Sequence, residues 1–228
     1  MYSLIADEID FIVVDKHAGA SFHSEENTQG LVELIRADKK IDLWPVHRLD
    51  KATSGLLILA KNKKSCRDLC VLFEQKKIQK YYLAISDCTS KQLKKKQGLI
   101  LGDMERARSG SWRLSKTKHK PAVTQFFSYS IAPNRRLFVL KPHTGKTHQL
   151  RVALKSIGAP IFGDTRYGAS KSLAARMYLH AYQLHFNLAG VDYTYQSYSS
   201  EGEFALAAHF LKSQIVNPND LSWPTLSI

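Results

Sequence analysis

The sequence predicts an α+β fold, in which helices and loops flank one mostly antiparallel or mixed central sheet. Three observations support this class. Short β-branched runs and helical patterns intermix without a strict strand–helix–strand alternation. The chain has 228 residues, of which 44% are hydrophobic, so it can bury one sizeable core. A chain of this length could form one large domain or two small ones; no internal repeat is visible, and a single domain over residues 1–228 is the simpler expectation.

Strands are predicted where short apolar or β-branched runs end at turn residues. The run "GLLILAKN" at 55–62 is continuously apolar over a strand's length, which is typical of a strand buried on both faces. Pro133-Asn134 separates two further runs and predicts a turn between them. The predicted strands are 10–19 (with its turn), 55–62, 80–86, 122–131, 136–142 and 177–188.

Helices are predicted where apolar residues recur at intervals of three and four. Thr28 is the candidate N-cap of the first helix and Thr147 that of the third, which Gly158 should end as a C′ glycine. The predicted helices are 28–40, 63–77, 147–158 and 202–216. Residues 91–121 are basic, polar and weakly periodic, and they predict an extended hairpin or a mobile arm.

The charge balance limits the possible partners. The 33 Lys and Arg residues against 20 Asp and Glu give a formal net charge of +13 and a pI of about 9.6. This excess favours a polyanionic partner, since neutralising phosphates releases counterions, although a solvated basic surface remains the plainer alternative. No apolar run reaches membrane-spanning length, and the acidic start argues against an export signal.

Three cysteines without a CxxC pair indicate neither a disulfide framework nor a zinc site. The histidines also lack the spacing of metal ligands, so no metal is expected. These features fit a reducing, cytoplasmic setting.

The stretch "VHRLDKATSGLLILAKN" (46–62) places Asp50 in a loop just before the buried strand. Such a loop is anchored, and Thr53 and Gly55 permit a fixed turn, so Asp50 could be a reacting group. A nearby Arg48 would keep the carboxylate ionised. From these residues alone, an aspartate that only caps the turn or pairs with Arg48 is equally acceptable.

A second candidate element is "KPHTGKTHQLR" (141–151), in which Lys146 and His148 lie at a helix start. Arg151 departs from the apolar stripe of that helix. If buried, it needs a carboxylate partner such as Asp50, and a bidentate pair favours arginine over lysine. The alternative is an ordinary surface arginine.

Together these motifs resemble one family. His47-Arg48-Leu49-Asp50 followed by Thr53-Ser54-Gly55 resembles the HRLDxxTSG signature of the RluA-type pseudouridine synthases. Other blocks agree in order and spacing, so that the resemblance covers roughly residues 9–210: "DFIVVDKHAG" at 10–19, "KYYLA" at 80–84, "KPAVT" at 120–124, "PHTGKTHQLRVAL" with "GAPIFGDTRYG" between 142 and 168, and "YLHAYQLHF" at 178–186.

The resemblance implies an RNA pseudouridine synthase that needs neither a cofactor nor a metal. It places Asp50 at the sugar of the target uridine, either attacking carbon 1′ or taking a proton from carbon 2′. Tyr82 would stack on the uracil, with a part in removing the carbon-5 proton, and Arg151 would ion-pair with Asp50. Arg48 would fill the gap left by the flipped nucleotide. The residues expected to contact RNA are His47, Arg48, Thr53, Lys80, Lys146 and His148.

The expected substrate is ribosomal and/or transfer RNA, and the expected state is a monomer. The sequence departs from the family pattern at His17, Lys146 and Ala153, where the family has proline, arginine and histidine. These positions bear on RNA contacts rather than on Asp50. Because the core begins by residue 9, we expect no N-terminal accessory domain, and the basic arm should supply RNA affinity.

Three alternatives are weighed against this interpretation. A catalytically silent RNA-binding protein would explain the charge but not the joint presence of Asp50, Tyr82 and Arg151. An N-glycoside hydrolase commonly needs a second acid or base, and no paired carboxylate motif appears. A DNA-binding protein would be expected to show a helix-turn-helix or zinc-finger pattern, and neither is evident.

Overall fold

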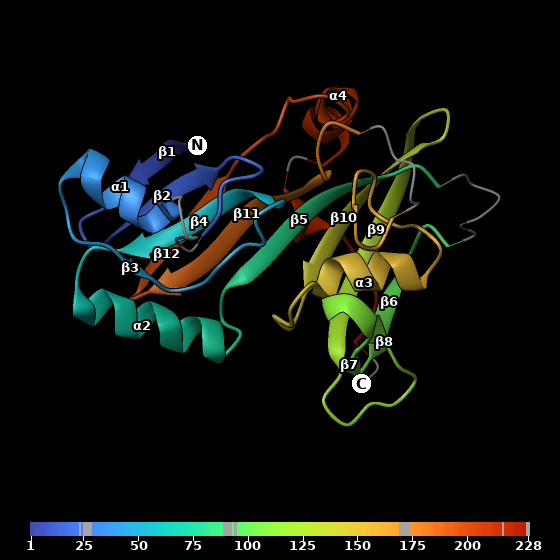
Figure 1. Ribbon diagram of the computed structural model, residues 1–228, viewed down its shortest axis with the longest axis horizontal. Helices are drawn as coiled ribbons and strands as arrows, with labels where there is room; N and C mark the ends of the chain where they lie inside the picture. Colours follow the sequence, from blue (N-terminus) through green and yellow to red (C-terminus); the bar gives the residue numbers. More distant parts are fainter. Residues whose placement is uncertain are drawn as a thin grey trace. The chain divides into compact units, whose positions relative to one another are not determined.

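The computed structural model describes residues 1–22, 24, 29–88, 93, 95–168, 174–215 and 217–226. Within it the chain forms two compact units (Figure 1). The first comprises Met1–Lys80 and His180–Tyr198, and the second comprises Tyr81–Leu179 and Ser199–Ile228. Each unit combines strands with helices, so the predicted α+β class is confirmed. The single-domain organisation stays a prediction.

The first unit is built on a mixed sheet. Its strands pair in the order β1, β2, β4, β11 and β12, with the short β3 also on β4. Every pair is antiparallel except β4 with β11, which is parallel. The strand bounds are β1 Tyr2–Asp7, β2 Phe11–Lys16, β3 Trp44–Pro45, β4 Ser54–Ala60, β11 Leu179–Leu188 (in this unit from His180) and β12 Val191–Gln196.

Alternate residues of β2 and β4 point to opposite faces of this sheet, and each face has its own apolar cluster. One cluster joins Val14 and Leu57 to α1, Leu31–Lys39. The other joins Val13 and Leu56 to Leu69 of α2, Lys63–Glu74. Figure 1 shows α1 and α2 on opposite sides of the β2–β4 pair. Every residue of β4 is buried, which confirms the prediction of a strand covered on both faces.

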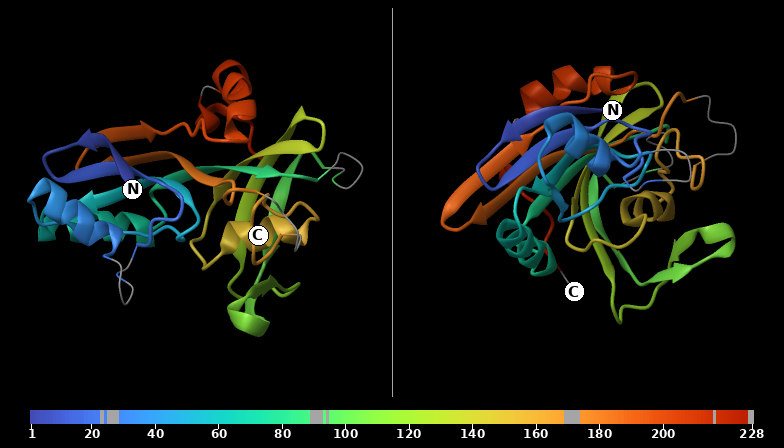
Figure 2. Two further views of the ribbon diagram at one scale, coloured as in Figure 1. Left: turned by 45° about the horizontal axis from the view of Figure 1, so that its top comes forward. Right: turned by 60° about the vertical axis from the view of Figure 1, so that its left-hand side comes forward.

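The second unit is antiparallel, with the strand order β5, β10, β9, β6. A separate hairpin of β7 and β8, closed by the turn Arg108–Gly110, stands away from these strands (Figure 2). The extended hairpin that we predicted within residues 91–121 is present at Met104–Leu114. Gln97–Gly102 of the same predicted arm form β6 instead, a strand of the sheet that pairs with β9. The bounds are β5 Gln79–Ser86 (in this unit from Tyr81), β6 Gln97–Gly102, β7 Met104–Arg106, β8 Trp112–Leu114, β9 Ala122–Ala132 and β10 Arg135–Pro142.

The helices of the second unit are α3, Gln149–Ser156, and α4, Phe204–Gln214, and a short 3₁₀ turn follows at Pro218–Asp220. In the first unit α1 begins after Gly30 and is shorter than predicted, while the proposed cap Thr28 lies outside the described residues. No helix in the described part of the chain is long and apolar enough to cross a membrane.

The prediction that Thr147 caps α3 was wrong. The N-cap is His148, in the left-handed region at φ 56°, and it makes no side-chain capping bond. The Gln149 side chain stabilises this entry instead, because its Oε1 accepts the backbone N–H of Lys146 at 3.0 Å and the hydroxyl of Thr144 at 2.7 Å. Gly158 follows the helix at φ 75°, as a C′ glycine should.

Strands β1 and β12 were missed by the sequence patterns. Most residues of β1 and half of those of β12 are exposed, so their side chains show no clean alternation between apolar and polar. They join the sheet through backbone hydrogen bonds to β2 and β11, which depend little on side-chain pattern.

Candidate active site

The loop that carries Asp50 is a fixed turn. The carbonyl of Asp50 accepts the backbone N–H of Thr53 at 3.0 Å. Leu49, only 5% exposed, anchors the chain on the preceding side. Asp50 itself is partly exposed and Arg48 is exposed, so both side chains can reach a ligand. The turn therefore presents a carboxylate and a cation from a rigid support.

A buried lysine at the end of β2 connects this loop to the strand through hydrogen bonds. Lys16 has no exposed surface, and its Nζ donates to the carbonyls of Lys51 and Ala20, each at 2.9 Å. The Gly19 backbone N–H donates to the same Lys51 carbonyl at 2.9 Å. Lys51 follows Asp50 directly, so these bonds restrain the aspartate's own backbone. Sequence reasoning missed Lys16, although it begins the turn that resembles the family's opening motif.

Gly55 is required by two independent constraints. Its φ of 111° is one that side chains rarely adopt, and a Cβ here would lie 2.3 Å from the carbonyl oxygen of Ala181. Ala181 is its neighbour in the parallel pairing of β4 with β11. The glycine of the Thr-Ser-Gly sequence thus lets β11 approach the end of the Asp50 loop.

His180 fixes the adjoining serine and was another omission. It is 1% exposed, and its Nε2 lies 2.9 Å from the carbonyl oxygen of Ser197, which can only accept a hydrogen bond. The proton is therefore on Nε2, and Nδ1 accepts the Ser54 hydroxyl at 2.9 Å. The sequence gave no sign of this bond, which joins residues 126 positions apart.

His47 makes two contacts within the protein, and its predicted contact with RNA stays a prediction. Its Nε2 accepts the backbone N–H of Ile58 at 2.9 Å, and its ring stacks on Phe73 with centroids 4.4 Å apart. Burial, aided by the charge of Lys80, lowers the pKa of His47 to about 3. The imidazole is thus a neutral acceptor that holds the loop against β4. Thr53 is 3% exposed, and its predicted contact with RNA stays a prediction.

Lys80 approaches the Phe73 ring, with its Nζ 6.0 Å from the centroid. Burial lowers the pKa of this lysine from its usual range. Tyr82, two residues further along β5, is partly exposed and lies opposite Leu140 of β10. A partly exposed ring on a paired strand is a rigid surface on which a base can stack.

Arg151 is held in a bidentate ion pair within the second unit. Its Nε and Nη2 each donate over 2.8 Å to the two carboxylate oxygens of Asp164. The arginine is 8% exposed and the aspartate 1% exposed. The sequence predicted that a buried Arg151 would form a bidentate pair with a carboxylate, and the structure shows such a pair with Asp164. The expected pair with Asp50 stays a prediction.

Asp164 is stabilised as an anion. Burial by itself raises the pKa of its carboxyl, but the hydrogen bonds and charge of Arg151 outweigh this effect, together with the N–H groups of Arg166 and Tyr167. The net result is a pKa below the usual value. Asp164 belongs to the "GDTRYG" block that carried part of the family resemblance, so the sequence contained a signal for it.

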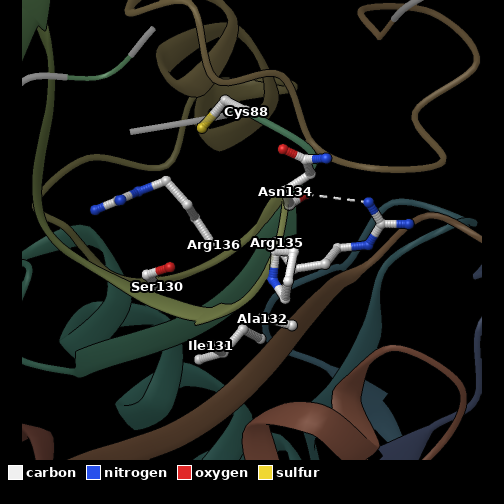
Figure 3. A pocket seen from close by; sticks show the side chains of 8 residues that line it. Cys88, Ser130, Ile131, Ala132, Asn134, Arg135 and Arg136 are labelled. Atoms are coloured by element: carbon white, nitrogen blue, oxygen red, sulfur yellow. Dashed lines mark hydrogen bonds between the residues drawn. The ribbon is translucent and has the colours of Figure 1, made fainter. Parts of the chain in front are cut away.

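The two remaining predicted RNA contacts lie just before Arg151. Lys146 is exposed, whereas His148 is partly buried and its Nδ1 lies 2.9 Å from the hydroxyl of Tyr167. A cavity of about 530 Å³ also lies in this unit, at the turn between β9 and β10. In Figure 3, Arg135 and Arg136 point to opposite sides of that turn. None of the predicted site residues lines it.

The structure therefore gathers the predicted residues into two groups. His47, Arg48, Asp50, Thr53 and Lys80 lie in the first unit, and Tyr82, Lys146, His148 and Arg151 lie in the second. The juxtaposition of Asp50 with Tyr82 and Arg151 stays a prediction from the resemblance. Among the described residues, no three His, Cys, Asp or Glu side chains are grouped so as to hold a metal ion.

Comparison with known proteins identifies the family. The family described as RNA pseudouridylate synthase matches residues 10–156. A Haemophilus influenzae protein named an uncharacterized RNA pseudouridine synthase is 50% identical over 196 residues, 86% of each chain. A Rickettsia bellii protein named ribosomal large subunit pseudouridine synthase C is 34% identical, over 78% of this chain and 61% of its own length.

A Pasteurella multocida protein named tRNA pseudouridine synthase C is 31% identical, over 77% of this chain and 81% of its own length. The solved structure of human RNA pseudouridylate synthase domain containing 1 agrees in fold, with a TM-score of 0.75 at 24% identity. It covers 88% of this chain and 84% of the human one. With its motifs, its fold and these relatives in agreement, the chain belongs to the RluA-type RNA pseudouridine synthases and is an isomerase that acts on RNA.

Proposed function

We propose that Asp50 is the catalytic carboxylate of this synthase and acts at the sugar of the target uridine, with Tyr82 and Arg151 completing the site. One observation supports this most directly: Asp50 is partly exposed on a turn whose backbone is held by the Thr53 N–H and whose next carbonyl is held by buried Lys16. Such support is what a reacting group needs in order to keep a productive geometry.

The reaction is an isomerisation, so its atoms balance within the nucleotide. The bond between uracil N1 and carbon 1′ breaks, a bond from uracil carbon 5 to carbon 1′ forms, and the proton of carbon 5 is lost while N1 gains one. A base inside a helical stack must first be extruded, at a cost of a few kcal/mol. Exposed Arg48 would fill the vacated space. Tyr82 would stack on the free uracil while it turns.

The RNA surface in this proposal includes the β7–β8 hairpin and the segment that follows it. Exposed cations along it are Arg106, Arg108, Arg113, Lys116, Lys118 and Lys120. We propose ribosomal and/or transfer RNA as the substrate, because relatives are named for each. The proposal further assigns the enzyme to the cytoplasm as a monomer that uses no metal or organic cofactor.

The decisive experiment compares wild type with Asp50→Asn on total RNA from a strain that lacks the gene. Pseudouridines are mapped across ribosomal and transfer RNA before and after incubation with each protein. We expect wild type to restore a site lost in the deletion strain. The amide side chain of the variant lacks the carboxylate charge, so we expect its rate to be lower by about a thousandfold or more.

Asp42→Asn is the matched control, since Asp42 is an exposed acid of the same unit outside the loop. It should restore the site at the wild-type rate. Full activity of the Asp50→Asn protein would overturn the assigned role. A wild-type protein that binds the RNA but restores no site would instead favour the silent RNA-binding alternative.

A further inference from the structure

A tyrosine outside the predicted site lies directly against the Arg151 guanidinium. Tyr167 is 3% exposed, and the Cζ of Arg151 lies over its ring, 5.0 Å from the centroid. The carboxylate of Asp164 accepts two hydrogen bonds from one edge of the guanidinium and so restrains it within its own plane. The ring restrains the group in the perpendicular direction, since a cation–π contact favours the face of the ring. Together the two contacts define the position of Arg151.

The hydroxyl of the same tyrosine is bonded to the basic hairpin. It accepts the backbone N–H of Trp112, the first residue of β8, at 2.9 Å. Its second partner is Nδ1 of His148, also at 2.9 Å. Because the Trp112 N–H can only donate, the tyrosine proton is left for Nδ1 of a neutral His148. One side chain thus links the start of α3, the hairpin and Arg151.

A second bond from the same segment fixes the turn of the hairpin. Arg166 donates through Nη1 to the carbonyl of Ser109 at 2.6 Å. Two cations of the hairpin, Arg106 and Arg108, are exposed. Within the segment 164–167, the Asp164 carboxylate and the Tyr167 ring contact Arg151. The Tyr167 hydroxyl and the Arg166 guanidinium contact the hairpin, which belongs to the proposed RNA surface.

We infer that Tyr167 is a positioning residue of this synthase: it links the β7–β8 hairpin to Arg151, so that RNA bound on the hairpin holds the guanidinium in its working position. The inference rests on the proposed role of Arg151. Tyr167 need not touch RNA itself, since its ring is buried and both of its polar contacts are within the protein.

The test uses Tyr167→Phe, which keeps the ring over Arg151 and removes only the hydroxyl. Rates are measured with enzyme in excess over total RNA from the deletion strain, and the affinity is taken from the enzyme concentration at half-maximal rate. We expect the rate of the saturated complex to be lower by about tenfold, the value of one or two hydrogen bonds, while affinity stays within about twofold.

Linkage to the hairpin is tested by combining this change with Arg106→Ala and Arg108→Ala. In the wild-type background the hairpin change should lower both the affinity and the saturated rate. In the Tyr167→Phe background it should lower the affinity but lower the saturated rate by less, because the hydroxyl bond to Trp112 is already lost and only the Arg166 bond to Ser109 still joins this segment to the hairpin. Such non-additivity is the signature of coupled residues, and a merely structural tyrosine would not produce it.

Tyr182→Phe is the matched control, since it removes a buried hydroxyl that bonds to Tyr198 at 2.9 Å in the other unit. It should change neither rate nor affinity, and melting temperatures of both variants monitor folding. An unchanged saturated rate in Tyr167→Phe, or fully additive hairpin effects, would overturn the inference alone. An inactive wild type would overturn the proposed function and this inference with it.

Discussion

At the scale of single residues, the same motif contains side chains that are open to solvent and side chains that make contacts within the protein. Asp50 and Arg48 are at least partly exposed, whereas His47 and Thr53 are bonded or buried within the protein. The motif letters alone do not separate these classes, because an imidazole or hydroxyl can serve either purpose. Burial and hydrogen-bond partners distinguish them, and they show that His47 holds the loop against β4.

The imidazole of His47, bonded to Ile58 and stacked on Phe73, makes the free energy of unfolding depend on pH. Its pKa is lowered to about 3, first by burial and then by Lys80, whereas an unfolded chain has the ordinary value of 6.5. Between these two pH values the unfolded state binds more protons than the folded state. The free energy of unfolding is therefore unaffected by His47 above about pH 6.5 and decreases as the pH falls below it. The loss is at most about 1.4 kcal/mol for each pH unit.

This is measured by urea unfolding at pH 7 and pH 5 in wild type and in His47→Gln. A glutamine amide can accept the Ile58 N–H without titrating, so the variant should lose less stability between the two pH values. His185→Gln changes a histidine outside the loop and controls for general effects. Equal losses in wild type and His47→Gln would contradict the assignment.

At the scale of elements, strand β4 shows what an apolar sequence pattern can predict and what it cannot. Its continuous apolar run predicted burial on both faces, and α1 and α2 provide that cover. The pattern could not reveal that β11 pairs with β4 in parallel, since strand pairing joins residues far apart in sequence. Gly55 is the residue in β4 that reflects this pairing, because a side chain there would overlap the backbone of β11.

Gly55→Ala should therefore destabilise the first unit strongly. The added Cβ would lie 2.3 Å from the Ala181 carbonyl and 2.4 Å from its backbone nitrogen, in a backbone conformation that already disfavours alanine. We expect a loss of about 3 kcal/mol or more in the free energy of unfolding.

Gly190→Ala separates the two causes, because Gly190 also has a positive φ, 86°, but no atom within 4 Å of the added Cβ. Its cost should be only about 1 kcal/mol, from backbone strain. Chemical denaturation measures both variants. Similar losses at both positions would show that the approach of β11 does not require the glycine.

At the scale of the whole molecule, the net charge of +13 predicted the class of partner before any motif was considered. The structure adds where part of that charge is presented, on the hairpin and the segment after it. Binding of RNA should therefore weaken steeply with salt, as counterions compete for the phosphates.

Replacing Arg106 and Arg108 by glutamine should reduce the slope of log affinity against log salt by about 1.4, since each single-strand phosphate contact contributes about 0.7. Filter binding of bulk transfer RNA between about 50 and 200 mM salt measures the slope. Lys39→Gln with Lys40→Gln removes the same charge from the end of α1 and should leave the slope unchanged. An equal reduction in both proteins would mean that only net charge matters.

The sequence by itself determined the fold class, most of the helices and buried strands, the family and the candidate residues Asp50, Tyr82 and Arg151. These follow from local periodicity and from motifs whose spacing is written in the chain. Only the tertiary structure showed that Asp164 holds Arg151, that Lys16 and His180 support the Asp50 loop, and that Tyr167 contacts both Arg151 and the hairpin. The physical reason is that each such contact joins residues distant in sequence, and its geometry exists only once the backbone is folded.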